Sequence, residues 1–211
     1  SDLEETRRPY VEANDFWGSP DNVFHIAHLL TPFRQVLNDY FGHSHPRAVP
    51  VSQYGDTHPE YFAELKGVRV CNLRSAGGSR IGHLCLAHPE VQELIYRQIL
   101  KDIDEGSPVA ALGQGDGYIP CECPACIDLY GVRPTADPEQ RGLAWRQDHA
   151  WGEKIWILHR EMAERLARDR PGALLMITAY SVTASPPATF DTFPGNVIIE
   201  LARYTPEYFE A

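Results

Sequence analysis

The apolar positions of the chain form short runs that alternate with longer stretches of helical spacing. The short runs are bounded by glycine, proline and other turn residues, as expected for strands that are covered on both faces. The longer stretches repeat apolar residues every three or four positions, which is typical of helices packed on a core. The pattern predicts strands at 83–86, 109–113, 173–180 and 197–201, and helices at 58–65, 89–106 and 148–171.

This order of elements predicts a parallel sheet wrapped by helices. We therefore expect an α/β fold of the (β/α)8 TIM-barrel type. A full barrel of this type takes about 250 residues, so in a chain of 211 residues we expect an incomplete one. We interpret residues 1–211 as a single domain, with a loop insertion at about 117–147 that carries three cysteines.

Two carboxylates lie where strands of this sheet are expected to end. Asp116 follows the strand at 109–113 between two glycines, and Glu200 interrupts an otherwise apolar strand. Right-handed crossovers place such strand ends at one edge, where α/β proteins keep their sites. From composition alone, Asp116 is better explained as a residue that shapes a Gly-Asp-Gly turn. Glu200 is equally suited to a structural ion pair with Arg203. Glu122 is a third acidic candidate, but between two cysteines we expect a loop residue.

The motif Cys121-x-Cys123-x-x-Cys126 is a local device, because a general disulfide framework would spread its cysteines along the chain. Three thiolates at this spacing could occupy three corners of a structural zinc site, with Cys71, Cys85 or a histidine as the fourth ligand. The alternatives are a Cys121–Cys126 or Cys123–Cys126 disulfide, or unreactive thiols.

Composition limits the kinds of molecule that the protein could bind and the cellular locations that fit it. The net charge of −10 argues against nucleic acid, because phosphate binding requires a basic surface. No apolar run approaches the length of a membrane span. The first residues, 1–5, lack the basic start and apolar core of a signal peptide. The periplasmic or secreted location that we expect therefore assumes that a leader has been removed.

Four motifs in order carry a resemblance to a known family: residues 58–63 (HPEYFA), 84–91 (LCLAHPEV), Gly115-Asp116-Gly117 with the cysteines, and 178–181 (TAYS). Over residues 55–205 the chain resembles a bacterial family of glycoside-hydrolase-like barrels long labelled a domain of unknown function. Some relatives of that family act as endo-β-N-acetylglucosaminidases, and more distant resemblance runs to hexosaminidase and α-glucuronidase barrels. The chain departs from the family pattern at Gly115 and His88, where the family usually has asparagine.

The resemblance implies a glycoside hydrolase that acts on a glycan, with a linkage next to an N-acetylhexosamine as the candidate site of cleavage. Asp116 would serve as an acid/base or acetamido-orienting residue, with Glu200 as the partner carboxylate. The sugar would be bound by His25, His28, His88 and Tyr180. No cofactor is required for this chemistry. The alternatives are a non-catalytic carbohydrate-binding relative of the same barrel and, from another class, a cysteine-based metal or redox module unrelated to sugar.

Overall fold

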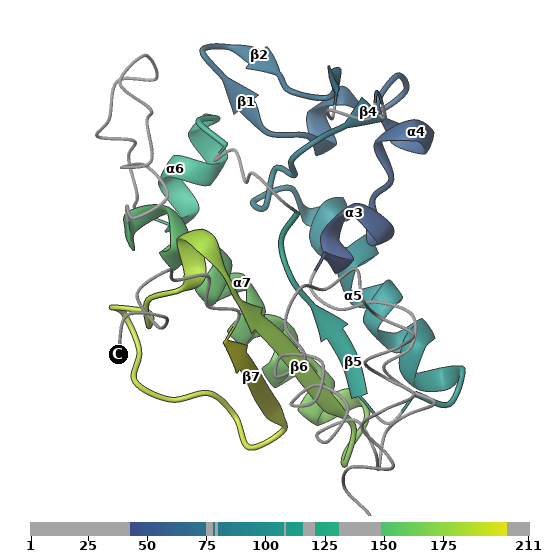
Figure 1. Cartoon of the computed structure of the whole chain (residues 1–211), viewed down its shortest axis with the longest axis vertical. Coiled ribbons are helices and arrows are strands. Elements are labelled where there is room, and N and C mark those ends of the chain that lie inside the picture. The colour runs from purple at the N-terminus through teal and green to yellow at the C-terminus, as the bar shows by residue number, and fades with distance from the viewer. Residues whose placement is uncertain are drawn as a thin grey trace, which may run out of the picture. The chain divides into compact units, whose positions relative to one another are not determined.

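A computed structural model describes residues 43–74, 78, 80–107, 109–115, 121–130 and 149–201 of the protein (Figure 1). The predicted sites Asp116, His25 and His28 lie outside these residues, as does Arg203. In the described part of the chain, no helix combines the length and the apolar character needed to cross a bilayer.

The central element is a three-stranded parallel sheet in the order β5-β6-β7. Its strands are β5 (Val109–Leu112), β6 (Leu174–Ala179) and β7 (Val197–Leu201), which confirms three of the predicted strands. Leu112 pairs with Ile177, and Ile177 pairs with Ile199. The carboxyl ends of the three strands therefore lie at the same edge, as the order of elements predicts.

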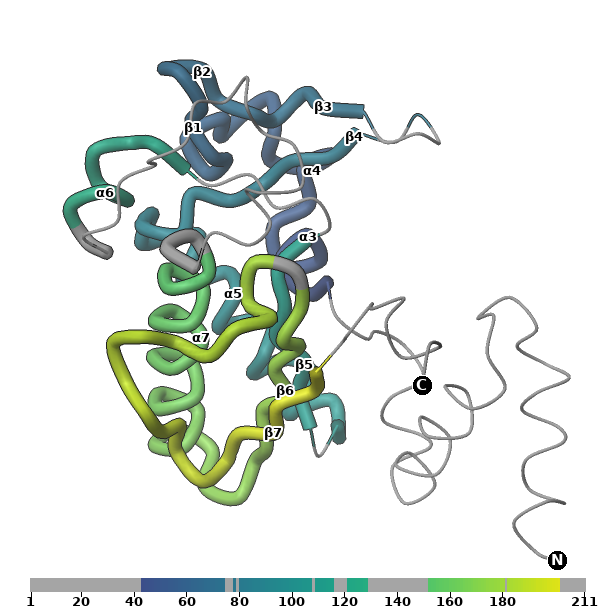
Figure 2. Tube along the Cα trace, turned by 60° about the vertical axis from the view of Figure 1, so that its left-hand side comes forward, coloured from purple at the N-terminus to yellow at the C-terminus, as the bar shows by residue number. Residues whose placement is uncertain are grey.

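Two long helices pack on one face of this sheet (Figures 1 and 2). Helix α5 (Pro89–Asp104) begins with a proline, whose fixed φ suits the first helical turn, and is followed by Gly106 at φ +101°. Helix α7 (His149–Asp169) contributes apolar residues at helical spacing. The shared core includes Val91, Ile95 and Ile99 of α5, Ile155, Leu158, Met162 and Leu166 of α7, and Leu112, Leu175 and Ile177 of the sheet.

A group of short elements lies beyond the carboxyl edge of β5 (Figure 1). It contains the antiparallel hairpins β1 (Glu64–Leu65) with β2 (Val68–Arg69) and β3 (Leu73–Arg74) with β4 (Arg80–Ile81). Lys66 and Gly67 form the first turn with φ values of 50° and 77°, as a two-residue hairpin turn of type I′ requires. The described helices of this part are α3 (Ser44–Ala48), α4 (Val51–Tyr54), η3 (Pro59–Tyr61), α6 (Pro124–Tyr130) and η6 (Ser181–Thr183).

The (β/α)8 barrel prediction is wrong. The described residues form sheets of two, two and three strands, which makes a small mixed α/β fold. The predicted strand at 83–86 does not join the parallel sheet. Leu84 instead forms an isolated antiparallel bridge to Phe62, and the Cys85 amide donates a hydrogen bond of 2.8 Å to the Tyr61 carbonyl. The predicted helix at 58–65 shrinks to η3, because its last two residues form β1.

The predicted insertion after Asp116 is described only in part. Residues 121–130 contain α6, and residues 131–148 lie outside the described ranges. The single-domain interpretation and the bounds of the insertion therefore stay predictions.

Candidate metal centre

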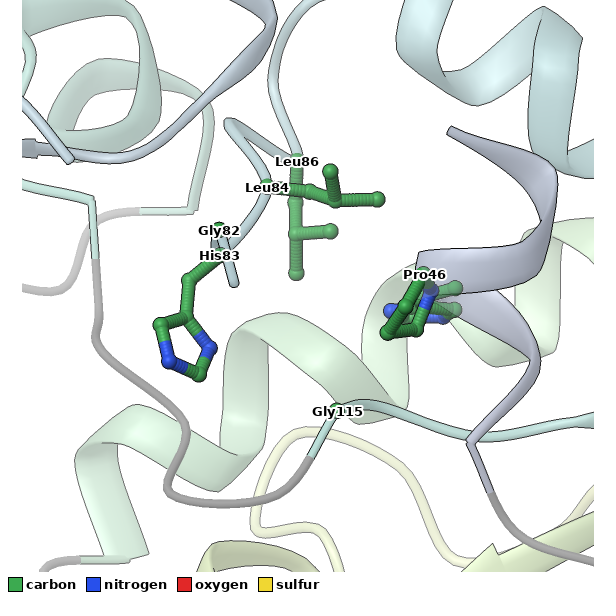
Figure 3. A pocket seen from close by; sticks show the side chains of 7 residues that line it. Pro46, Gly82, His83, Leu84, Leu86 and Gly115 are labelled. Atoms are coloured by element: carbon green, nitrogen blue, oxygen red, sulfur yellow. The ribbon is translucent and has the colours of Figure 1, made fainter. Parts of the chain in front are cut away.

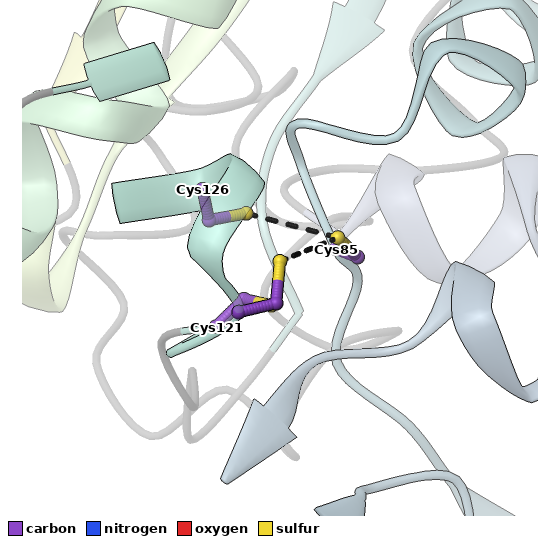
Figure 4. A group of neighbouring side chains, drawn as sticks. Cys85, Cys121 and Cys126 are labelled. Carbon is purple, nitrogen blue, oxygen red and sulfur yellow. Dashed lines mark hydrogen bonds between the residues drawn. The ribbon is translucent and has the colours of Figure 1, made fainter. Parts of the chain in front are cut away.

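Four cysteines from two distant segments meet in the group of short elements. Cys85 lies in the connection from β4 to α5, whereas Cys121 and Cys123 precede α6 and Cys126 lies in its first turn. Their sulfur atoms all lie within 4.8 Å of one another, and each residue is at most 4% exposed. Figure 4 shows the side chains of Cys85, Cys121 and Cys126 converging from these two segments. The cluster could bind a metal ion.

Two of the sulfur–sulfur distances match the edge of a metal tetrahedron. The Cys85 Sγ lies 3.6 Å from Cys123 Sγ and 3.7 Å from Cys126 Sγ. Four sulfurs at about 2.3 Å from a zinc ion would be separated by about 3.8 Å along each edge, whereas a disulfide bond is about 2.05 Å long. None of the five cysteines forms a disulfide bond in the structure. The spacing therefore favours ligands around a common centre over the disulfide alternatives.

Backbone amides point at two of the sulfurs. The Glu64 amide in β1 donates to Cys121 Sγ at 3.3 Å, and the Ala87 amide donates to Cys126 Sγ at 3.4 Å. A hydrogen bond to sulfur favours the thiolate, which is the form that binds metal. The two donors thus come from β1 and from the loop that follows Cys85.

The hairpin β1–β2 also fixes the cysteine segment through Glu122. The Glu122 amide donates to the Glu64 carbonyl at 2.8 Å, and its carboxylate accepts from the Lys66 amide at 2.8 Å. Glu122 therefore holds a loop in place, as expected for a residue between two ligands, and its carboxylate has a structural partner.

The thiols cannot all ionise together without a counter-charge. Hydrogen bonding with Cys121, followed by burial, raises the pKa of the Cys85 thiol to about 12. Hydrogen bonds from Cys126 and Cys85 lower the pKa of the Cys121 thiol far below its ordinary value. The thiols of Cys85, Cys123 and Cys126 share protons through hydrogen bonds. A divalent cation would displace these protons, so metal binding at this cluster is coupled to proton release.

The sequence left the fourth member of the cluster open, and the structure identifies it as Cys85. Cys71 is also buried, but it packs in the main core, and its sulfur lies 3.9 Å from the Arg69 carbonyl. Of the candidates Cys71, Cys85 and histidine, the structure brings only Cys85 to the three clustered cysteines among the residues it describes. Cys71 is therefore a buried thiol outside the site, and it can serve as a control for Cys85.

Glu200 lies at the sheet edge that was predicted for a sugar site. It pairs in register with Thr178 of β6, whose hydroxyl donates to Glu200 Oε2 at 3.1 Å. Burial raises the pKa of Glu200, and the hydrogen bond from Thr178 partly offsets this rise. The carboxyl is thus a partly buried group at the carboxyl end of a parallel strand.

Tyr180 and His88 have different neighbours. Tyr180 follows β6, and its ring contacts the His43 ring edge-on at 5.9 Å. His88 precedes α5, and its ring lies 4.9 Å from that of Tyr61. The His88 Nδ1 atom is buried without a hydrogen-bond partner in the described part of the protein. His25 and His28 lie outside the described residues, so the set of sugar-binding residues stays a prediction.

A small cavity at the end of β5 involves histidines that the sequence did not single out as a pair. It is lined by His45, His83 and Gly115, together with Pro46, Gly82, Leu84 and Leu86. Figure 3 shows His83 and Pro46 on opposite sides of this cavity. His45 Nε2 lies 3.2 Å from His159 Nε2, and both rings are fully buried. A pair 114 residues apart in sequence gives no local signal that could have revealed it.

A family model described as a domain of unknown function (DUF4838) matches residues 9–210. The chain belongs to this family. No curated protein and no solved structure matches the chain. The four clustered cysteines all lie inside the DUF4838 match, so the candidate metal centre is part of the family domain in this chain.

Proposed function

We propose that this DUF4838 domain binds one structural zinc ion through Cys85, Cys121, Cys123 and Cys126. The observation that carries the proposal is a set of four buried sulfurs within 4.8 Å of one another, in which two separations match the edge of a zinc–thiolate tetrahedron. Four thiolate ligands are typical of structural zinc sites, whereas catalytic sites keep a position open for water or substrate. The burial of the sulfurs also argues against a redox module, since reactive cysteines are accessible to their partners.

The proposed ion would fix the chain next to the end of β5. Gly115 is the last described residue after β5, and Cys121 is the next described residue. The zinc would hold Cys121 against the loop that contains Cys85. Gly115 and Cys121 would then both be fixed, Gly115 by the strand that precedes it and Cys121 by the metal.

Metal analysis of purified protein tests this proposal. We expect one zinc ion per chain in the wild type and in Cys71→Ala, because Cys71 lies outside the cluster. Replacement of Cys121 or Cys126 by serine should abolish stoichiometric binding. A wild-type protein that takes up no zinc under reducing conditions, or equal loss of zinc in Cys71→Ala, would contradict the proposal.

As a second function we propose glycoside hydrolysis, with Asp116 and Glu200 as the carboxylates. The support is the sequence resemblance, together with the raised pKa of Glu200 at the end of a parallel strand. A carboxyl with a raised pKa is suited to protonating the leaving-group oxygen, whereas its partner stays ionised as base, nucleophile or acetamido-orienting group. In this role Thr178 would orient the Glu200 carboxyl through its hydroxyl.

Turnover of an aryl β-N-acetylglucosaminide and of complex glycans tests the second function. We expect Asp116→Asn and Glu200→Gln each to lower kcat by at least about a hundredfold, the scale of a lost acid–base catalyst. Unchanged turnover in either variant would remove that residue from the mechanism. Binding of glycans without hydrolysis by the wild type would instead identify a carbohydrate-binding protein.

A further inference from the structure

A pocket lies between α7, β7 and the connection from β6 to β7, which comprises residues 180–196. Figure 2 shows this connection passing beside α7. The pocket has a volume of about 430 Å³, which is within the usual range of small-molecule sites. Its walls are mainly apolar and include Trp156, Phe190, Phe193, Ile199 and Leu201.

The pocket lies on the opposite face of β7 from Glu200. Ile199 and Leu201 line it, and successive side chains of a strand point to opposite faces of the sheet. Glu200, which stands between them, instead accepts a hydrogen bond from the Thr178 hydroxyl of β6. The pocket is therefore separate from the carboxylate predicted for sugar chemistry, and it depends on neither of the functions proposed above.

Contacts with α7 hold the connection in place. The Trp156 indole donates a hydrogen bond of 2.8 Å to the Ser185 carbonyl. The Glu153 carboxylate accepts hydrogen bonds from the Ala188 and Thr189 amides at 2.7 and 3.0 Å. The walls of the pocket are thus fixed before a ligand arrives, which lowers the entropic cost of binding.

Three aromatic rings form a continuous part of the wall. The ring centroids of Trp156 and Phe193 lie 5.6 Å apart, and those of Phe193 and Phe190 lie 5.1 Å apart. The faces of such rings attract a cation that lies within about 6 Å of the centroid. Phe190 already holds one in this way, because the Arg160 guanidinium lies 4.8 Å from its centroid. Arg160 also pairs with Glu164 at 2.9 Å, which offsets its positive charge.

The fixed charges at the pocket are negative. Asp191 is the only charged residue among the described lining residues, and it is exposed. The Glu153 carboxylate adds a second negative charge where it binds the connection. A carboxylate beside aromatic rings suits a ligand that is positively charged but apolar at its surface. Quaternary ammonium groups have this combination, because alkyl groups cover the charge and no N–H requires an acceptor.

We propose that this pocket binds a small quaternary ammonium compound. The alkyl groups of the ligand contact the wall formed by Trp156, Phe190 and Phe193, and its positive charge is balanced by Asp191. An uncharged molecule of the same shape would bury the same apolar surface but would lose the attraction to the rings and to the carboxylate. The charge of the ligand is therefore the property to vary.

Isothermal titration calorimetry with choline tests the inference, with its uncharged analogue, in which carbon replaces the ammonium nitrogen, as the matched ligand. We expect the wild type to bind choline about 10-fold more tightly than the analogue. Asp191→Asn and Phe193→Leu should each weaken choline binding about 3- to 10-fold. The affinity of Asp191→Asn for the analogue should stay unchanged. Glu105→Gln, which removes an exposed carboxylate at the end of α5, should bind both ligands as the wild type does.

A wild type that binds no choline, or that binds choline and the uncharged analogue equally well, would overturn the inference. Unchanged choline affinity in both Asp191→Asn and Phe193→Leu would also overturn it, because the ligand would then lie elsewhere. Asp191 is exposed, so Asp191→Asn should melt within about 2 °C of the wild type. A loss of choline binding in this variant is therefore separable from a loss of folding, even if Phe193→Leu is unstable.

Discussion

Removal of Cys85 should destabilise the zinc-loaded protein far more than removal of Cys71. Both cysteines are buried, with exposed fractions of 3% and 5%, so replacing either by alanine leaves a similar small cavity. Such a cavity costs about 1 kcal/mol. The two variants differ in that Cys85 is a ligand through which the metal would join two distant segments, whereas Cys71 lies in the main core.

The size of the difference follows from the loop that the metal would close. Cys85 and Cys123 are separated by 38 residues. In the chain-entropy model, a cross-link that closes a loop of this length stabilises the folded state by about 4 kcal/mol at 25 °C. We therefore expect Cys85→Ala to lose about 5 kcal/mol of unfolding free energy with zinc, and Cys71→Ala to lose about 1 kcal/mol.

Urea unfolding under reducing conditions, with zinc and with a strong chelator, measures both quantities. The chelator should lower the stability of the wild type and of Cys71→Ala, and should bring all three proteins to within about 1 kcal/mol of one another. A wild type whose stability does not respond to the chelator would refute the reasoning. So would equal losses in the two variants when zinc is present.

Two further predictions concern the body of the domain. Burial and the neighbouring His43 lower the pKa of His45 to about 3. Between this value and the unfolded pKa of about 6.5, the unfolded chain binds a proton that the folded protein does not. The free energy of unfolding should therefore fall as the pH falls from about 6.5 toward 3, with a slope that approaches about 1.4 kcal/mol per pH unit. Urea unfolding of His45→Gln at several pH values should show a flatter profile than the wild type, and parallel profiles would contradict the assignment. Gly152→Ala places a methyl group 2.0 Å from the Val182 carbonyl oxygen. This clash should lower the free energy of unfolding of the variant by about 2 kcal/mol or more and lower its melting temperature accordingly. Gly195→Ala, where nothing lies within 4 Å of the added Cβ, should melt within about 2 °C of the wild type; similar behaviour of the two variants would show that α7 and η6 are not in close contact.

The parallel sheet was predictable because its strands are defined locally. The runs that contain Val109, Leu175 and Val197 are apolar and bounded by turn residues, and the helices before β5 and β6 carry clear apolar stripes. The number of strands and their partners is a tertiary property. Leu84 lies in an equally apolar run, but it bridges to Phe62, and no local pattern distinguishes that partner from β5.

The candidate site was predictable only in part for the same reason. The spacing of Cys121, Cys123 and Cys126 identified three of its four members. Cys71 and Cys85 lie in similar surroundings in the sequence, so only the fold selects between them.

X-ray absorption spectroscopy at the zinc edge of the zinc-loaded wild type tests the central claim most directly. The account predicts four sulfur scatterers at about 2.3 Å and no nitrogen or oxygen in the first shell. Replacing Cys85 by alanine should reduce the sulfur count to three and introduce a lighter scatterer or abolish binding. A wild-type shell with two or fewer sulfurs, or unaltered scattering in the Cys85 variant, would contradict the site.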